Sequence, residues 1–170
     1  MIQVDIPGVV VEDLQLHTDE RGSFLEIFRA SSYGTNFVQA NLSRSRAGVL
    51  RGLHYHARQA DLWLVVSGRL QVGLADIRTK SVASIQTSTI VLTSNHPTTI
   101  YIPPGVAHGF LALTEVELIY FVTSEYDSTD EHGIAWDDSS LAIQWSTDSP
   151  ILSDRDRHNE RLNWDRIPAF

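Results

Sequence analysis

The chain has 170 residues, with 13 basic and 21 acidic side chains and therefore a formal net charge of −8. This length fits one domain, and a hydrophobic share of 42% is ordinary for a globular protein, which excludes disordered and collagen-like classes. Cysteine is absent, so a disulfide framework, a thiolate nucleophile and a sulfur-ligated metal site are excluded as well.

Two kinds of partner are not expected. The acidic balance and the lack of a basic run argue against nucleic acid. Residues 1–20 carry neither a basic start nor a long apolar stretch, so the sequence indicates no signal peptide and no membrane span there. We therefore expect a cytoplasmic protein that binds neither nucleic acid nor a membrane.

Apolar runs of strand length follow one another from Phe37 onward, separated by turn signals. Such regular spacing is typical of a β-sandwich or jelly-roll barrel. The predicted strands are residues 37–42, 61–77 with a Ser-Gly turn in the middle, 83–92, 98–103, 109–114 and 116–123. Short helices are expected near Ser31–Tyr33 and Ser139–Ala142, the second with an Asp or Ser cap. The prediction is an all-β fold with few short helices.

The whole chain, residues 1–170, is predicted to form a single domain with two appendages. About residues 1–35 form an N-terminal arm, and about residues 147–170 form a C-terminal tail. The tail is more charged than the strand region but contains Leu162, Trp164 and Phe170, so we expect it to dock on the core.

Histidines gather in the segment RGLHYHARQAD, and a further one follows in IPPGVAHGF. The spacing is similar to the two motifs of the cupin superfamily. The matching positions are Gly48, His54, His56, Asp61, Gly68, Pro103, Gly105 and His108. Three imidazoles and a carboxylate suit a divalent Mn, Fe, Ni or Zn ion. Alternatively, His56 and His108 are polar wall residues of a barrel cavity.

A second resemblance extends from about Asp19 to Asp156. The segments DERGSFLE, FVQANLSRS, GVLRGLHYH, GRLQVGLADIR, IPPGVAHGF, LIYFVTSEYD, GIAWDD, LAIQW and ILSDRD occur in the order and nearly the spacing of the dTDP-4-dehydrorhamnose 3,5-epimerase family. The resemblance implies a cupin-type jelly roll and a homodimer that exchanges N-terminal strands. It also implies a cofactor-free isomerase of deoxysugar biosynthesis, which inverts carbons beside the 4-keto group of a dTDP-linked 6-deoxyhexose.

The resemblance assigns three catalytic roles. His54 matches the general base, Asp156 the carboxylate that orients it, and Tyr120 the acid on the opposite face of the sugar. These residue types suit the reaction, because removing a weakly acidic C–H beside a ketone needs a base such as histidine, and inversion needs a second donor. The resemblance also implies a set of substrate-binding residues: Arg21, Phe24, Glu26, Gln39, Arg51, His108 and Tyr126.

Three positions depart from the family pattern. Asp61 stands where most members have the Lys that stabilises the enolate oxygen, and Val72 stands where they have Asp. The only lysine, Lys80, is not at the matching position. His56 stands where members often have Gln, and His56 with Asp61 recreates the metal-ligand pattern of other cupins.

Three interpretations follow. The first is a dTDP-4-keto-6-deoxysugar epimerase that inverts C3, C5 or both, without a cofactor. The second is a metal-dependent cupin enzyme, an isomerase, cyclase, lyase or dioxygenase, with His54, His56, Asp61 and His108 as ligands. The third is a non-catalytic module that binds a sugar nucleotide or a carbohydrate, which Tyr120 and Asp156 argue against.

Overall fold

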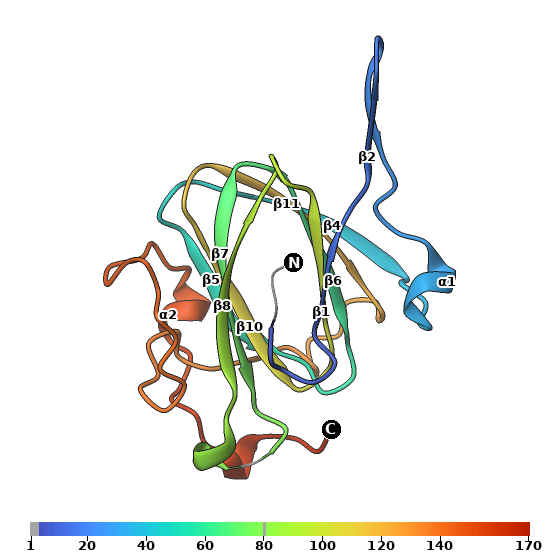
Figure 1. Ribbon diagram of the computed structural model, residues 1–170. Coiled ribbons are helices and arrows are strands. Elements are labelled where there is room, and N and C mark those ends of the chain that lie inside the picture. Colours follow the sequence, from blue (N-terminus) through green and yellow to red (C-terminus); the bar gives the residue numbers. More distant parts are fainter. Residues whose placement is uncertain (1–3, 80) are drawn as a thin grey trace.

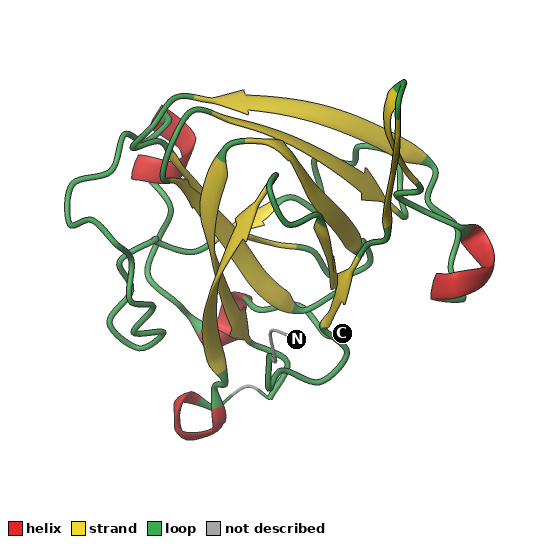
Figure 2. Ribbon diagram, turned by 45° about the horizontal axis from the view of Figure 1, so that its top comes forward, coloured by secondary structure: helices red, strands yellow, loops and turns green. Residues whose placement is uncertain are grey.

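The computed structural model describes residues 4–79 and 81–170, so Lys80 lies outside the described residues. Two five-stranded antiparallel sheets face each other as a β-sandwich (Figures 1 and 2). The first sheet has the strand order β1-β9-β6-β11-β4, and the second has the order β12-β5-β10-β7-β8. This confirms the predicted all-β fold with few short helices.

The strands are β1 (Val10–Asp13), β2 (Leu16–Asp19), β3 (Gly22–Leu25), β4 (Gln39–Ser45), β5 (Leu50–Tyr55), β6 (Asp61–Ser67), β7 (Arg69–Asp76), β8 (Thr87–Thr93), β9 (Thr98–Ile102), β10 (Val106–Ala112), β11 (Val116–Val122) and β12 (His132–Gly133). The helices are α1 (Ala30–Tyr33) and α2 (Asp154–Arg157), with 3-10 turns at Val82–Ser84 and Trp164–Arg166. No helix in the described part of the chain is long and apolar enough to cross a membrane.

The core lies between the two sheets. Strand β10 is buried along its whole length in the middle of the second sheet, and β6 is buried over its first five residues in the middle of the first. The Trp63 ring of β6 meets the Phe110 ring of β10 edge to face, with centroids 5.8 Å apart. Aromatic contacts of this kind hold the sheets at a fixed separation.

A close backbone approach joins β5 and β10. Gly52 has a φ of 123°, which favours glycine, and a Cβ built there would lie 2.7 Å from the Cα of Gly109. A Cβ built at Gly109 would lie 2.6 Å from the carbonyl oxygen of Arg51. The strands can therefore come this close only because both positions lack a side chain, and the resulting register pairs His54 with His108.

Strands β2 and β3 form a hairpin that projects away from the sandwich (Figure 1). All four residues of β2 are exposed, as are three of the four in β3. The sequence does not predict this hairpin, because strands exposed on both faces lack the alternation of apolar and polar residues that marks a half-buried strand.

The helix predicted near Ser31–Tyr33 is confirmed by α1, whereas the one predicted at Ser139–Ala142 is wrong. There, the Asp138 carboxylate accepts hydrogen bonds from the backbone N–H groups of Ser140 and Leu162 and stabilises a turn, and Ala142 leaves the helical region with a φ of 49°. Likewise, residues 83–86 are not a strand, since a 3-10 turn precedes β8.

The C-terminal segment packs on the second sheet. Ile167 is buried, and Leu162 and Trp164 pack against the same cluster, which contains Leu53 of β5. Helix α2 in this segment begins at a cap in which Ser153 Oγ accepts from the backbone N–H of Asp156. This cap places the Asp156 side chain next to β5.

Candidate active site

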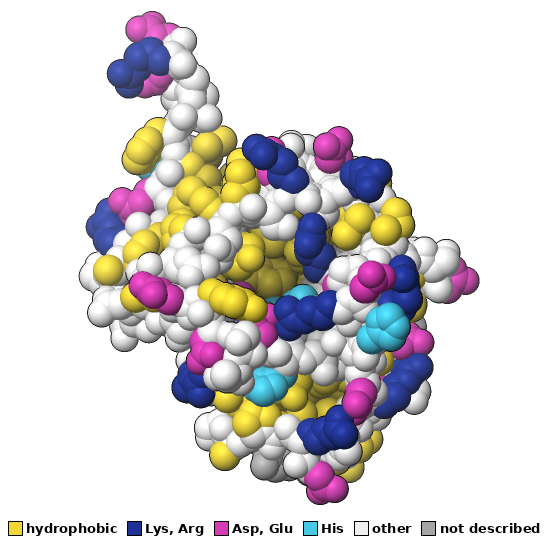
Figure 3. Space-filling view, turned by 180° about the vertical axis from the view of Figure 1, so that it is seen from behind, with side chains coloured by type: hydrophobic (Ala, Val, Ile, Leu, Met, Phe, Trp, Pro, Cys, Tyr) yellow, Lys and Arg dark blue, Asp and Glu magenta, His cyan; other side chains and the backbone are white. Residues whose placement is uncertain are grey.

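A cavity of about 290 Å³ opens between the two sheets. Figure 3 shows a hollow of this character, with a hydrophobic floor and with histidine and charged side chains around its rim. The lining residues come from both sheets and the loops beside them: Ser43, Arg51, His54, His56, Gln59, Asp61, Trp63, His108, Gly109, Phe110, Leu118, Tyr120, Tyr126, Glu131 and Arg155. Seven residues predicted for the site from sequence are thus brought together: Arg51, His54, His56, Asp61, His108, Tyr120 and Tyr126.

His54 of β5 and Asp156 of α2 form a part-buried hydrogen-bonded pair beside the second sheet. The Nε2 atom of His54 lies 2.6 Å from Oδ1 of Asp156, whose other oxygen accepts from the Ser153 hydroxyl at 2.8 Å. Burial by itself would raise the pKa of Asp156, but the hydrogen bonds from His54, Ser153 and the backbone of Gly52 outweigh it and hold the pKa below its usual range. Because an ionised carboxylate only accepts, Nε2 donates, and the lone pair of the neutral ring is on Nδ1.

Tyr120 lines the same cavity from the first sheet. It lies on β11, whereas His54 lies on β5 of the facing sheet. Burial raises the pKa of the Tyr120 phenol, and the negative charges of Asp61 and Glu131 raise it further. The phenol therefore keeps its proton at neutral pH and can donate it.

His56, Asp61 and His108 form a second cluster in the cavity. One ligand atom of each lies within 4.8 Å of the others, and all three residues are buried. His54, the fourth predicted metal ligand, is not part of this group, since its Nε2 is bonded to Asp156. Burial lowers the pKa of His108 to about 4, against the opposing attraction of the Asp61 carboxylate.

The cavity also has lining residues that sequence reasoning missed. Arg155 donates to the Glu131 carboxylate at 2.9 Å, and Gln59 donates to Asp61 at 2.9 Å. Arg155 directly precedes Asp156, so its position in the sequence next to a predicted catalytic residue could have indicated that it lines the cavity. Glu131 gave no such signal, because it follows a loop without strand or helix periodicity.

The remaining predicted binding residues divide into two groups. Gln39 lies outside the lining set, but its side-chain oxygen accepts from the backbone N–H of Tyr126, which does line the cavity. Arg21, Phe24 and Glu26 do not line it. Glu26 follows the projecting hairpin and pairs with Arg29.

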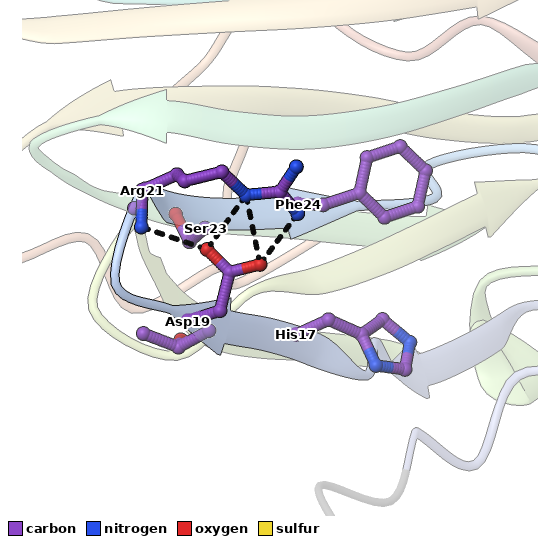
Figure 4. A pocket seen from close by; sticks show the side chains of 7 residues that line it. His17, Asp19, Arg21, Ser23 and Phe24 are labelled. Carbon is purple, nitrogen blue, oxygen red and sulfur yellow. Dashed lines mark hydrogen bonds and ion pairs between the residues drawn. The ribbon is translucent and has the colours of Figure 1, made fainter.

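Arg21 and Phe24 lie on the projecting hairpin itself (Figure 4). Arg21 pairs with Asp19 on the surface, and Phe24 is 66% exposed. A hollow of about 450 Å³ runs along this hairpin, and the described residues that line it all belong to the hairpin: His17, Thr18, Asp19, Arg21, Gly22, Ser23 and Phe24. The hairpin thus carries residues predicted to bind the substrate, but within its own chain it holds them away from the cavity.

Comparisons with known proteins show to which family the chain is similar. The family model described as dTDP-4-dehydrorhamnose 3,5-epimerase matches residues 3–163. The spore coat polysaccharide biosynthesis protein SpsL of Bacillus subtilis is 40% identical over 148 residues, which cover 84% of this chain and 98% of SpsL. The dTDP-4-dehydrorhamnose 3,5-epimerase of Shigella flexneri is 34% identical over 172 residues, covering 95% of each chain.

Solved structures give the same result. The dTDP-6-deoxy-D-glucose-3,5-epimerase RmlC from Legionella pneumophila, in complex with dTDP-4-keto-L-rhamnose, superposes with a TM-score of 0.88. It is 30% identical, and the match covers 99% of this chain and 97% of that one. The shared fold, together with the family match over nearly the whole sequence, shows that this chain belongs to the dTDP-4-dehydrorhamnose 3,5-epimerase family.

Proposed function

We propose that this protein is an isomerase that acts on a dTDP-linked 4-keto-6-deoxyhexose and inverts C3, C5 or both. The observation that carries the proposal is that His54, hydrogen-bonded to Asp156 of α2, and Tyr120 line one cavity from the two facing sheets. A base on one wall and an acid on the other is the arrangement that inversion of a carbon requires, because the proton must leave one face and return to the other.

In this mechanism the neutral His54 ring removes the proton through Nδ1. The C–H bond beside the ketone breaks, its electron pair forms an enolate with the C4 oxygen, and the Asp156 carboxylate stabilises the imidazolium through Nε2. Tyr120 then donates its phenolic proton to the same carbon from the opposite side. The products are the inverted 4-keto sugar, His54 in its protonated form and a Tyr120 phenolate, which exchange protons with water before the next turnover.

The diphosphate of the substrate has cationic partners at the cavity. Arg51 and Arg155 both line it, and the Arg51 guanidinium is oriented by Ser45 Oγ, 2.9 Å from its Nε. Arginine binds phosphate oxygens with two parallel donors and is always charged. We assign these two arginines to the diphosphate.

The hairpin residues require a second copy of the chain. Arg21 and Phe24 lie outside the cavity of their own chain, and the arm exposes Val10, Leu16 and Phe24, which are 50%, 43% and 66% exposed. Apolar side chains on a projecting arm are typical of an interface. We therefore propose a homodimer in which each hairpin places Arg21 and Phe24 at the nucleotide end of the other chain's cavity.

Solvent exchange tests the reaction. The protein is incubated in deuterated water with a dTDP-linked 4-keto-6-deoxyhexose, and proton NMR follows C3 and C5. The proposal expects deuterium at the inverted carbon and loss of both exchange and inversion in His54→Asn. Absence of deuterium from both carbons in the wild-type protein would refute it.

A mixing experiment tests the shared site. His54→Asn loses the base, and the double variant Arg21→Ala with Phe24→Ala loses the arm contacts, so each homodimer is inactive or weak. In a mixed dimer, one cavity combines an intact His54 with an intact arm. Random mixing should therefore restore about one quarter of the wild-type sites. No recovery after subunit exchange, shown to be complete by native mass spectrometry of the mixed dimer, would rule out an arm that acts in the partner's cavity.

A further inference from the structure

We infer that His56, Asp61 and His108 form a binding site for one divalent transition-metal ion on the wall of the active-site cavity. Their ligand atoms lie within 4.8 Å of one another, and Nε2 of His108 is 3.9 Å from Oδ2 of Asp61. Ligands around one ion lie about 3 Å apart, so small side-chain movements close the site. Two imidazoles and one carboxylate form a set suited to Mn, Fe, Co, Ni or Zn, with positions left open for a substrate.

Both imidazoles are held in the orientation that a metal ligand needs. Nδ1 of His56 lies 2.9 Å from the carbonyl oxygen of Asp130, and Nδ1 of His108 lies 2.9 Å from that of Val106. A carbonyl oxygen only accepts, so Nδ1 carries the hydrogen in each ring. In the neutral rings, the lone pair is therefore on Nε2. Histidine ligands in proteins are usually fixed in this way by a backbone carbonyl or carboxylate.

Asp61 is a buried carboxylate without a cationic partner among the described residues. It is 4% exposed, and its two oxygens accept from neutral donors, the Gln59 amide at 2.9 Å and the Trp63 indole at 3.0 Å. Within residues 4–79 and 81–170, no arginine forms an ion pair with it. Burying a charge is costly unless it is paired or coordinates a metal. A divalent cation between Asp61 and the two rings supplies the missing positive charge.

The position of the site suggests what the ion does, and this part rests on the proposed function. The cluster lines the same cavity as His54 and Tyr120, and the Asp61 charge acts on the Tyr120 phenol. A cation here can bind the C4 oxygen of the sugar and stabilise the enolate as a Lewis acid. His54 stays outside the ligand set and keeps its Asp156 partner, so the base and the metal do not compete for one residue.

The test is metal binding by the full-length protein. The protein is dialysed against a chelator and then titrated with Co²⁺ by visible absorption and with Zn²⁺ by calorimetry. We expect one equivalent to bind. Asp61→Asn and His56→Gln should each weaken binding at least ~10-fold, since even residues that only support a ligand typically contribute that much. His96→Gln, which removes a largely exposed histidine paired with Asp13, is the matched control and should bind as the wild type does.

The outcomes separate the two proposals. Failure of the wild type to bind one equivalent, or unchanged affinity in a folded Asp61→Asn or His56→Gln variant, overturns the site. Thermal unfolding checks the fold of each variant, and two substitutions keep the test decisive if one does not fold. Solvent exchange is measured on the same samples. Metal binding without deuterium exchange would support the metal site and refute the proposed epimerase activity. Full exchange after complete removal of the metal would refute the Lewis-acid role.

Discussion

Replacing Asp156 with Asn tests the contribution of the carboxylate to the strength of the base. The substitution keeps the size of the side chain, and one orientation of the amide keeps an acceptor facing His54 Nε2 while its NH₂ group donates to Ser153. The change then removes only the negative charge that stabilises the imidazolium. In the flipped orientation the amide donates to Nε2, which moves the hydrogen to Nδ1 and removes the base altogether.

The size of the effect follows from the geometry. Opposite charges about 4 Å apart attract by about 4 kcal/mol at an effective dielectric constant of about 20. The His54 side chain is 24% exposed and that of Asp156 is 5% exposed, so solvent screens part of this attraction. If half remains, about 2 kcal/mol is lost from the transition state, which is a decrease in kcat of about 30-fold.

The assay is the initial rate of deuterium incorporation at C3 and C5 under saturating substrate. Asp154→Asn is the control, because Asp154 lies in the same helix but is exposed and pairs with Arg157 on the surface. It should leave the rate unchanged. An Asp156→Asn variant that is folded and retains a rate within about threefold of the wild type would show that the charge does not support the base.

Three further predictions concern the acid, the fold and its pH dependence. Tyr120→Phe should lower the rate of inversion about 100-fold, whereas deuterium exchange at the same carbon continues, because only reprotonation from the opposite face is lost. NMR measures both rates, and an equal loss of the two would contradict the role of Tyr120 as the acid. Gly109→Ala should lower the free energy of unfolding by about 1–3 kcal/mol, because the added Cβ would meet the Arg51 carbonyl oxygen. Urea titration measures this change, and an unchanged unfolding midpoint would refute the close approach. Burial by itself would raise the pKa of Asp138, but hydrogen bonds from Ser140 and the Leu162 N–H outweigh it and lower the pKa. A lowered folded-state pKa stabilises the fold above about pH 4 and ceases to do so as the pH falls through that pKa. Asp138→Asn should therefore cost about 1–3 kcal/mol at pH 7, with a smaller cost at pH 3, whereas Asp137→Asn, on the surface beside Arg161, should cost little at either pH.

The strands of the sandwich could be predicted because their pattern depends on burial. Strands β6, β7, β9 and β11 were predicted within a residue or two, since apolar side chains of these segments pack between the sheets. Strands β1 to β3 were not predicted, because most of their residues are exposed on both faces. A pattern of hydrophobicity carries no signal where nothing is buried.

The candidate site could be predicted in part. Motif spacing predicted that His54, His108 and Asp61 come together from separate strands. Strands β5 and β10 pair and set His54 opposite His108, whereas Asp61 reaches the same cavity from β6 of the facing sheet. The same spacing did not show that His54 pairs with Asp156, whereas His56 joins the cluster of Asp61 and His108. These two arrangements depend on contacts of a short helix and a loop. Ser153 caps α2 and so positions Asp156, and the carbonyl oxygen of Asp130 orients the His56 ring.

The proposed base and the proposed acid lie on different sheets, so the core also determines the distance between them. His54 and Tyr120 lie on strands that share no hydrogen bonds, so the gap between base and acid is set by the side chains packed between the layers. Facing sheets lie about 10 Å apart, a spacing that leaves room for one sugar ring between the two walls. Trp63 against Phe110 helps to hold that spacing next to the cavity. Under the proposed mechanism the thickness of the hydrophobic layer is therefore itself a determinant of stereochemistry, and a substitution in the core would impair inversion without changing His54 or Tyr120.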